Sequence, residues 1–157
     1  MSNTLKVTAP EGLPFVDFER EFDAPVAAVF AAHKDPALVA QWMGPDGYGM
    51  DVTEWDFTSG GRWAFVNIDG DQEYAFRGTF HTVRENEFAI QTFEFLGYPD
   101  VVSIESITFT DLGDGRTRLN AHAVYPTLEA RDGMVQSGME KGMSEGYDRL
   151  EKIVTGA

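Results

Sequence analysis

No cysteine occurs among the 157 residues. Disulfide bonds, thiol nucleophiles and thiolate-bound zinc are therefore excluded. Histidine is scarce as well, and His33, His81 and His122 have no ligand spacing such as HxxxH, so we predict no metal site and no cofactor. No segment reaches the ~20 apolar residues that span a bilayer, and the first residues lack the basic and apolar regions of a secretory signal. We therefore expect a cytoplasmic protein that does not insert into a membrane.

Positive charge is also in short supply. The chain has 12 Lys and Arg residues against 26 Asp and Glu residues, which gives a formal net charge of -14. A surface that acidic repels phosphate backbones and anionic lipid head groups. Nucleic acids and membranes are therefore not expected as partners.

Aromatic residues, in contrast, are plentiful, at 13% of the chain with twelve Phe. Because Phe buries a large area per residue, either the core is aromatic or a cavity is lined with rings. The length and the 43% apolar content fit one domain with its own core. From their Pro, Gly and polar content, residues 1–13 are expected to form a loose arm, and residues 14–157 a single domain.

The segment after the arm indicates one strand followed by two short helices. Residues 15–22 fit a strand, in which Phe18 and Phe22 flank the charged residues 19–21. Pro25 and Pro36 suit the first turn of a helix, where the missing N–H has no helical partner, and Asp35 is a good N-cap. The sequence Met-Gly-Pro-Asp-Gly at residues 43–47 ends the second helix.

Residues 48–125 change to a period of two that is interrupted by turns. Six strands joined by short turns must form an antiparallel meander, and Asp69-Gly70 is its strongest hairpin signal. Within residues 87–96 the aromatic side chains change parity, which predicts a bulge near Gln91 and Thr92.

The last segment, residues 127–154, predicts one long helix that is capped by Thr127 and covers the sheet. Gly138, Gly142 and Gly146 recur every four residues along it, and each costs a helix roughly 1 kcal/mol relative to Ala. Two reasons can explain why this ridge carries no side chains: close approach of the helix backbone to the sheet, or a void on the sheet side that is left open for a ligand. Gly142→Leu would fill a void without loss of stability but would overpack a closed interface.

Four segments carry a resemblance to a known family, and together they cover nearly the whole chain beyond the arm. They read FEREFDAPVAAVFAAHKDPALVAQWMGP, DFTSGGRWAFV, RGTFHTV and EARDGMVQSGMEKGMSEGYDRLEKIV. They resemble the START-like superfamily, also called SRPBCC or helix-grip, and within it the homologues of the activator of heat shock protein 90 ATPase. The resemblance implies an α+β helix-grip fold, in which a curved seven-stranded antiparallel sheet is wrapped around a long C-terminal helix. It also implies two short helices between strands 1 and 2, and a cavity between sheet and helix.

If such a cavity is present, large apolar side chains and the glycine ridge are expected to line it. The candidates are Trp42, Trp55, Trp63, Phe65, Phe76, Phe93, Met139, Gly142 and Met143. A polar side chain that points inward from a strand would fix the orientation of a ligand. The candidates for this role are Arg77, His81, Gln91, Glu105 and His122, although each of them belongs more often on a solvated face.

Three functions follow in order of preference. The first is binding of a small hydrophobic ligand in the internal cavity, for instance an aromatic or lipid-like molecule. The second is a cyclase- or hydrolase-like enzyme that uses a buried polar residue in the same cavity; no family motif carries over, so we name no catalytic residue. The third, an interaction module that acts on a chaperone ATPase, rests on the resemblance alone and ranks last. A homodimer stays open because a meander has exposed edge strands.

Overall fold

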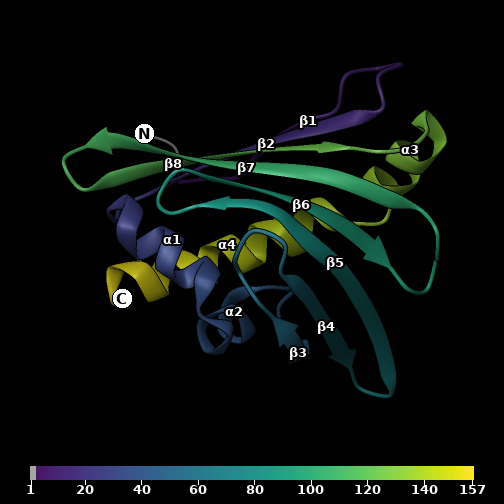
Figure 1. The fold of residues 1–157 in the computed structure, drawn as a ribbon, viewed down its shortest axis with the longest axis horizontal. Helices are drawn as coiled ribbons and strands as arrows, with labels where there is room; N and C mark the ends of the chain where they lie inside the picture. Colours follow the sequence, from purple (N-terminus) through teal and green to yellow (C-terminus); the bar gives the residue numbers. More distant parts are fainter. Residues whose placement is uncertain (1–2) are drawn as a thin grey trace.

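The computed structural model describes residues 3–157, which form eight strands and four helices. The strands are β1 (Lys6–Thr8), β2 (Phe15–Phe22), β3 (Gly49–Trp55), β4 (Arg62–Asp69), β5 (Gln72–Arg84), β6 (Phe88–Phe95), β7 (Val102–Gly113) and β8 (Arg116–Val124). The helices are α1 (Val26–Lys34), α2 (Pro36–Trp42), α3 (Leu128–Gln136) and α4 (Met139–Thr155). The strands form one antiparallel sheet in the order β1-β2-β8-β7-β6-β5-β4-β3. Figure 1 shows that the sheet curls around α1, α2 and α4, which lie on its concave side.

This architecture is the predicted helix-grip fold, with one strand more than expected. The additional strand is β1, which pairs with β2 in a register that sets Val7 opposite Phe18. An ion pair between Lys6 and Glu19, 3.6 Å between Nζ and Oε2, accompanies this pairing. Three residues of the segment that was expected to be a loose arm thus extend the sheet, while residues 1 and 2 of that segment lie outside the described residues.

The two short helices between β2 and β3 are confirmed, together with the signals that predicted them. The Asp35 side chain accepts a hydrogen bond from the backbone N–H of Ala37 at 2.9 Å, and Pro36 occupies the first turn of α2. At the end of α2, the buried Trp42 indole donates a hydrogen bond to the Ala32 carbonyl at 3.0 Å. This bond fixes α2 against α1 on the concave side of the sheet.

The predicted bulge lies on the neighbouring strand. The register between β5 and β6 shifts between Phe80 and Thr82 of β5, opposite Gln91 and Ile90. A bulge near Gln91 is thus present as predicted, but its extra residue belongs to β5, since β6 pairs with β7 without interruption. The parity change in β6 has a simpler cause, since its aromatic and aliphatic side chains occupy both faces of the strand.

The long C-terminal helix that was predicted is two helices. The Thr127 hydroxyl caps α3 by accepting a hydrogen bond from the Ala130 N–H at 3.0 Å, as expected. The chain then breaks at Gly138, whose φ of 86° is left-handed and favours a residue without a Cβ. Helical periodicity continues across this break, which is why the sequence pattern did not reveal it.

The other two glycines of the ridge allow close approach, but to α2 and the loop after it and not to the sheet: Gly146 meets backbone, and Gly142 meets a proline side chain. A Cβ on Gly146 would lie 2.8 Å from the Trp42 carbonyl oxygen, and a Cβ on Gly142 would lie 3.2 Å from the Pro45 Cγ. Gly142→Leu therefore tests the packing of α4 on this loop, and it does not test a void above the sheet.

Gly146→Ala is expected to destabilise the protein by about 1–3 kcal/mol, because the new methyl group meets a backbone carbonyl that cannot rotate away. The control is Gly133→Ala in α3, where nothing lies within 4 Å of the added Cβ. This control should gain roughly 0.5–1 kcal/mol of helix propensity. Urea denaturation of both variants measures the difference, and equal effects of the two changes would contradict the close approach.

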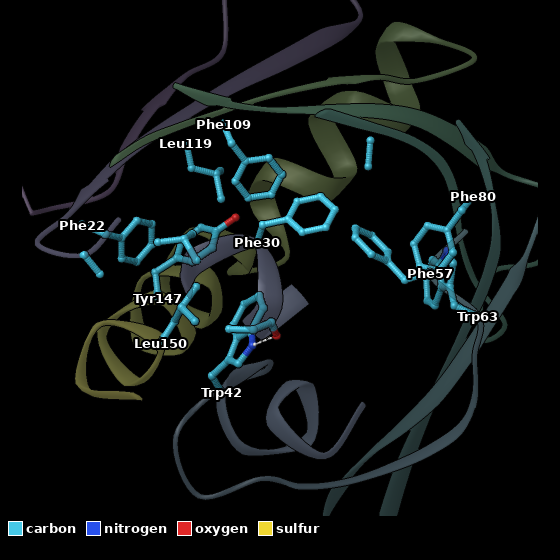
Figure 2. Close-up of a cluster of buried hydrophobic side chains, with 14 of the residues drawn as sticks. Phe22, Phe30, Trp42, Phe57, Trp63, Phe80, Phe109, Leu119, Tyr147 and Leu150 are labelled. Atoms are coloured by element: carbon cyan, nitrogen blue, oxygen red, sulfur yellow. Dashed lines mark hydrogen bonds between the residues drawn. The ribbon is translucent and has the colours of Figure 1, made fainter. Parts of the chain in front are cut away.

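The main core joins the helices to the sheet through aromatic rings. Figure 2 shows Phe22, Tyr147 and Leu150 on the side of α4, and Phe80 and Trp63 on the side of β4 and β5. Phe30 of α1 and Phe57 of the loop after β3 lie between these groups, with ring centroids 5.4 Å apart. The rings thus hold α1 and α4 inside the curl of the sheet.

Candidate functional site

Two polar side chains lie in a row that crosses the concave side of the sheet. Ala123 of β8 pairs with Glu105 of β7. Glu105 pairs in turn with Gln91 of β6, and Gln91 pairs with Phe80 of β5. Directly paired residues share a face of a sheet, and Ala123 and Phe80 are 1% and 0% exposed. Glu105 and Gln91 therefore point inward, on the side of the sheet that α4 occupies.

Several inward side chains near this pair keep partial access to solvent. Phe76, Phe93 and Ile107 are only partly buried, whereas Phe80 and Leu119 on the same side are completely buried. A helix that sealed the sheet along its whole length would bury all of them to the same degree. The inner surface, as we call this partly accessible region, consists of Phe76, Gln91, Phe93, Glu105 and Ile107 of the sheet and Met143 of α4.

Aromatic rings flank the polar pair on the side of β4 and β5. The Phe76 ring lies 5.1 Å from Phe65 and 5.4 Å from Phe93, measured between centroids. Trp63 adds a third contact, 5.6 Å from Phe93. Rings at these separations attract one another beyond the area that they bury. The result is a continuous aromatic platform beside the two polar groups.

Glu105 has one polar partner inside the protein. The Gln91 amide donates a hydrogen bond from Nε2 to Glu105 Oε1 at 3.1 Å. Burial raises the pKa of the Glu105 carboxyl to about 7, although the hydrogen bond from Gln91 acts in the opposite direction. Among residues 3–157, no Lys, Arg or His forms an ion pair with it.

The Glu105 carboxyl also affects the pKa of two phenol groups, those of Tyr125 and Tyr147. Burial raises the pKa of both phenols, and the negative charge of Glu105 raises it further. Both phenols therefore stay protonated and uncharged at neutral pH. Tyr125 follows β8, and Tyr147 belongs to α4, so the electrostatic influence of Glu105 reaches from the sheet to the helix.

Arg20 is the other inward-facing charge, and it is already neutralised. Its guanidinium is 2% exposed and lies 3.1 Å from Asp148 Oδ1 and 2.9 Å from Glu151 Oε1. Both acidic partners belong to α4, so the three side chains tie β2 to the helix. Sequence analysis missed Arg20, although its alternation with Phe18 and Phe22 is the signal that places it on the inner face.

The other three polar candidates point away from the inner surface. Arg77 donates from Nε to Glu94 Oε1 at 3.0 Å, on the outer face. His81 is exposed beside the β5 bulge, with its ring Nδ1 2.8 Å from the Thr82 hydroxyl. His122 lies 2.5 Å from Asp17, between Nδ1 and Oδ1. Of the five candidates, the structure thus brings only Gln91 and Glu105 together inside the molecule.

The predicted lining residues likewise divide into those near the inner surface and those that pack elsewhere. Phe65, Phe76 and Phe93 form the aromatic platform with Trp63. Met143 of α4 packs against the main core, which includes Trp63 and Phe65, and also against the cluster around Tyr125. Trp42 instead ties α2 to α1, and Trp55 ties β3 to α1, since its indole donates to the His33 carbonyl at 3.0 Å. Met139 packs with the separate cluster around β2 and Tyr125, and Gly142 faces Pro45.

A groove of ≈ 270 Å³ lies on the opposite, outer face of the sheet. Its lining is mostly polar and comes from β1, β2, β7 and β8: Lys6, Thr8, Asp17, Phe18, Glu19, Ser106, Thr108, Asn120, Ala121 and His122. The row Asp17, His122 and Ser106 crosses three neighbouring strands there. The described residues contain no group of three or more His, Asp or Glu side chains that could hold a metal ion, in this groove or elsewhere.

Two buried groups give the stability opposite dependences on pH. Burial lowers the pKa of His33 to about 4, although the hydrogen bond that its Nδ1 donates to the Val29 carbonyl raises the pKa. Because the unfolded chain then binds the extra proton from about pH 6.5 downwards, His33 makes stability rise with pH. Glu105 has a raised pKa, so its contribution is complete below about pH 4.5 and is lost as the pH rises through about 7.

Glu105→Gln should therefore stabilise the protein at about pH 8 and leave it unchanged near pH 4.5. The expected gain is about 2 kcal/mol, which allows for the partial solvation of the side chain. Urea denaturation at the two pH values measures it, with Glu73→Gln on the exposed part of β5 as the matched change of charge. A gain of the same size at both pH values would show that ionisation of Glu105 is not its cause.

The sequence model of one protein family, described as Activator of Hsp90 ATPase homolog 1-like protein, matches residues 23–155. No protein among those of curated function matches the chain. Solved structures do match. Protein Ms6760 from Mycobacterium smegmatis is 24% identical, with 98% of each chain covered and a TM-score of 0.87. A protein from Arthrobacter aurescens is 23% identical over 97% of this chain and 92% of its own, with a TM-score of 0.87.

A third solved structure is the AHSA1 protein from Silicibacter pomeroyi. It is 23% identical over 90% of this chain and 97% of its own, with a TM-score of 0.74. At these identities the structures support the fold alone. As for membranes, no helix within residues 3–157 is long and apolar enough to cross one.

Proposed function

Because the chain belongs to the Activator of Hsp90 ATPase homolog 1-like protein family and folds as a sheet that grips its last helix, we propose that it binds a small apolar molecule on the inner surface. One observation carries the proposal: Glu105 and Gln91 point inward beside an aromatic platform that stays partly accessible. Ligand sites combine apolar walls with a few convergent polar groups in this manner. We propose the cytoplasm as the place of this binding, on the sequence features given above.

The platform and the polar pair have separate tasks in this proposal. Phe76 and Phe93, which stay partly accessible while Trp63 supports Phe93 from the core, offer ring surfaces that favour a flat or aromatic ligand body. Gln91 and Glu105 would fix the orientation of that body by hydrogen bonding to its polar end. Met143 adapts to the shape of the ligand from the helix side, because an unbranched thioether repacks easily.

A second function is favoured by the raised pKa of Glu105. A carboxyl whose pKa lies near neutrality is suited to act as a general acid or base, so the same surface would serve an enzyme that moves a proton on its bound substrate. Glu105→Gln separates the two functions, because the amide keeps the shape and a hydrogen-bonding end but cannot exchange a proton. Turnover that survives Glu105→Gln would exclude the catalytic function.

Met143→Trp tests binding itself. If the inner surface is open, the larger ring occupies the ligand space and weakens binding of the neutral dye Nile red by about tenfold or more, or ~1.4 kcal/mol, with little change in stability. The native protein should enhance the fluorescence of the dye, and the variant should not. Val135→Trp, which adds the same ring at an exposed site on α3, is the control.

A dry interior gives the opposite pattern in this experiment. The native protein would not enhance Nile red fluorescence, and Met143→Trp would overpack a closed interface at a cost of about 1–3 kcal/mol. This combination would refute the proposed binding.

A further inference from the structure

The inner surface holds one carboxyl group without a matching positive charge. Two arginines are buried among the described residues: Asp148 and Glu151 neutralise Arg20, and Asp132 pairs with Arg131. The described residues offer Glu105 a neutral amide and two phenols in its surroundings. A carboxyl group is costly to bury without a partner, so this position gains most from a ligand that brings a positive charge.

The charge of the whole chain acts in the same direction. With a net charge of -14, the protein attracts cations and repels anions at long range. Phe93 follows Gln91 on β6, and together with Phe76 it keeps partial access to solvent. Ring faces attract cations. The net charge of the protein, the Glu105 carboxylate and the aromatic rings thus all favour a positively charged group.

We infer that the inner surface selects small apolar or aromatic molecules that carry a protonated amine, which pairs with the Glu105 carboxylate. This inference rests on the proposed binding function and adds the chemical class of the ligand. Gln91 holds Oε1 of Glu105 by its hydrogen bond and leaves Oε2 for the ammonium group. The apolar body of the ligand lies on the platform.

The groups that face Glu105 from the neighbouring elements determine how this pairing depends on pH. They are Gln91 of β6, Tyr125 after β8, Tyr147 of α4 and, beyond Tyr147, the neutralised Arg20 of β2. Both phenols stay uncharged up to high pH, because burial raises their pKa. Below about pH 9, Glu105 is therefore the group that titrates at this end of the inner surface.

A neutral carboxylic acid at the same position would recognise a different ligand. Protonated Glu105 would donate a hydrogen bond to a carbonyl group, and affinity would then rise as the pH falls. Pairing with an amine requires the ionised form, so affinity would fall with the pH. The sign of the pH dependence separates the two ligand classes without any variant.

The test uses four probes that share one naphthalene body: naphthylmethylamine, naphthalenemethanol, acetonaphthone and naphthylacetate. Calorimetric titration of the full-length protein at about pH 8 should give a dissociation constant for the amine about tenfold lower than for the alcohol, as expected for a charge-assisted hydrogen bond. The anionic naphthylacetate should bind most weakly. Between about pH 8 and pH 6, the affinity for the amine should fall about tenfold, because the ionised fraction of a group with a pKa of about 7 falls in that range.

Glu105→Gln supplies the second comparison. It should weaken binding of the amine about tenfold, while the affinity for the alcohol changes by no more than about twofold. Glu73→Gln on the exposed part of β5 should change neither affinity. Circular dichroism verifies the fold of each variant, and the pH profile of the unmodified protein provides a readout that depends on no variant.

Each result has one meaning. Equal affinities of the native protein for amine, alcohol and ketone, lost in Met143→Trp, would overturn the inference about the amine and leave the binding function standing. Preference for acetonaphthone with affinity rising at low pH would overturn it in favour of a neutral acid. Absence of binding by all four probes would overturn both the inference and the binding function on which it rests.

Discussion

Gly78→Ala is expected to destabilise the protein by about 3 kcal/mol, at the upper end of overpacking effects. A Cβ at this position would lie 2.1 Å from the Thr92 carbonyl oxygen and 2.6 Å from the Trp63 indole nitrogen. Neither can withdraw, because Thr92 belongs to β6 and the Trp63 ring is 2% exposed in the core. Urea denaturation followed by circular dichroism gives the free energy of unfolding.

Gly49→Ala is the matched control for this change. It also adds a methyl group to a strand, but its nearest neighbour would be the Ile68 Cβ at the ordinary distance of 3.6 Å. The control should be neutral or gain up to about 1 kcal/mol, since Gly weakens a strand relative to Ala. If Gly78→Ala were as stable as this control, the tight contact of β5 with Thr92 and the aromatic platform would be refuted.

Arg20→Met is expected to cost about 3 kcal/mol. The change leaves Glu151 of α4 without its buried partner, and removing one member of a buried ion pair is strongly destabilising. It also removes the contact of the guanidinium with the Phe22 ring, 4.7 Å from the centroid. Because α4 borders the inner surface, Nile red binding should weaken along with stability.

The control for this change is Arg62→Met on β4. The Arg62 side chain is 70% exposed and pairs with Glu54, which is 45% exposed. Surface ion pairs of this kind contribute ~0–1 kcal/mol. Thermal unfolding at low and high salt compares the two variants, and a loss in Arg20→Met no larger than in the control would show that β2 and α4 do not depend on the buried charge.

Local sequence signals predicted most of the fold because each of them reports on its own neighbourhood. The Asp35 and Thr127 side chains cap α2 and α3 as expected, and Gly70 lies in the turn between β4 and β5, directly after Asp69 at the end of β4. The resemblance supplied the arrangement of these elements. Strand β1 was not predicted, because three residues are too few to show a period. The break at Gly138 was not predicted, because the apolar stripe of residues 127–154 continues on both sides of it.

The candidate site could be predicted only in part, because it depends on how neighbouring strands pair. Whether a polar residue on a strand faces inward depends on register, and one bulge reverses the parity of everything beyond it. The bulge in β5 leaves both His81 and Thr82 on the outer face, while the regular β6 turns Gln91 inward. The ridge glycines were ambiguous because the sequence does not say that Pro45 and Trp42 face them.

The central claim, that a small apolar molecule binds on the inner surface, is tested most directly by methionine-methyl NMR during titration with naphthylmethylamine. We expect the Met143 methyl resonance to shift in a saturable manner, because Met143 of α4 is partly accessible and packs against the core on the concave side of the sheet. The Met50 methyl group on β3 should respond less, and Glu105→Gln should reduce the apparent affinity. Saturable binding in calorimetry that leaves the Met143 methyl resonance unshifted would place the ligand elsewhere, and absence of saturable binding would exclude a ligand; either result would contradict binding on the inner surface.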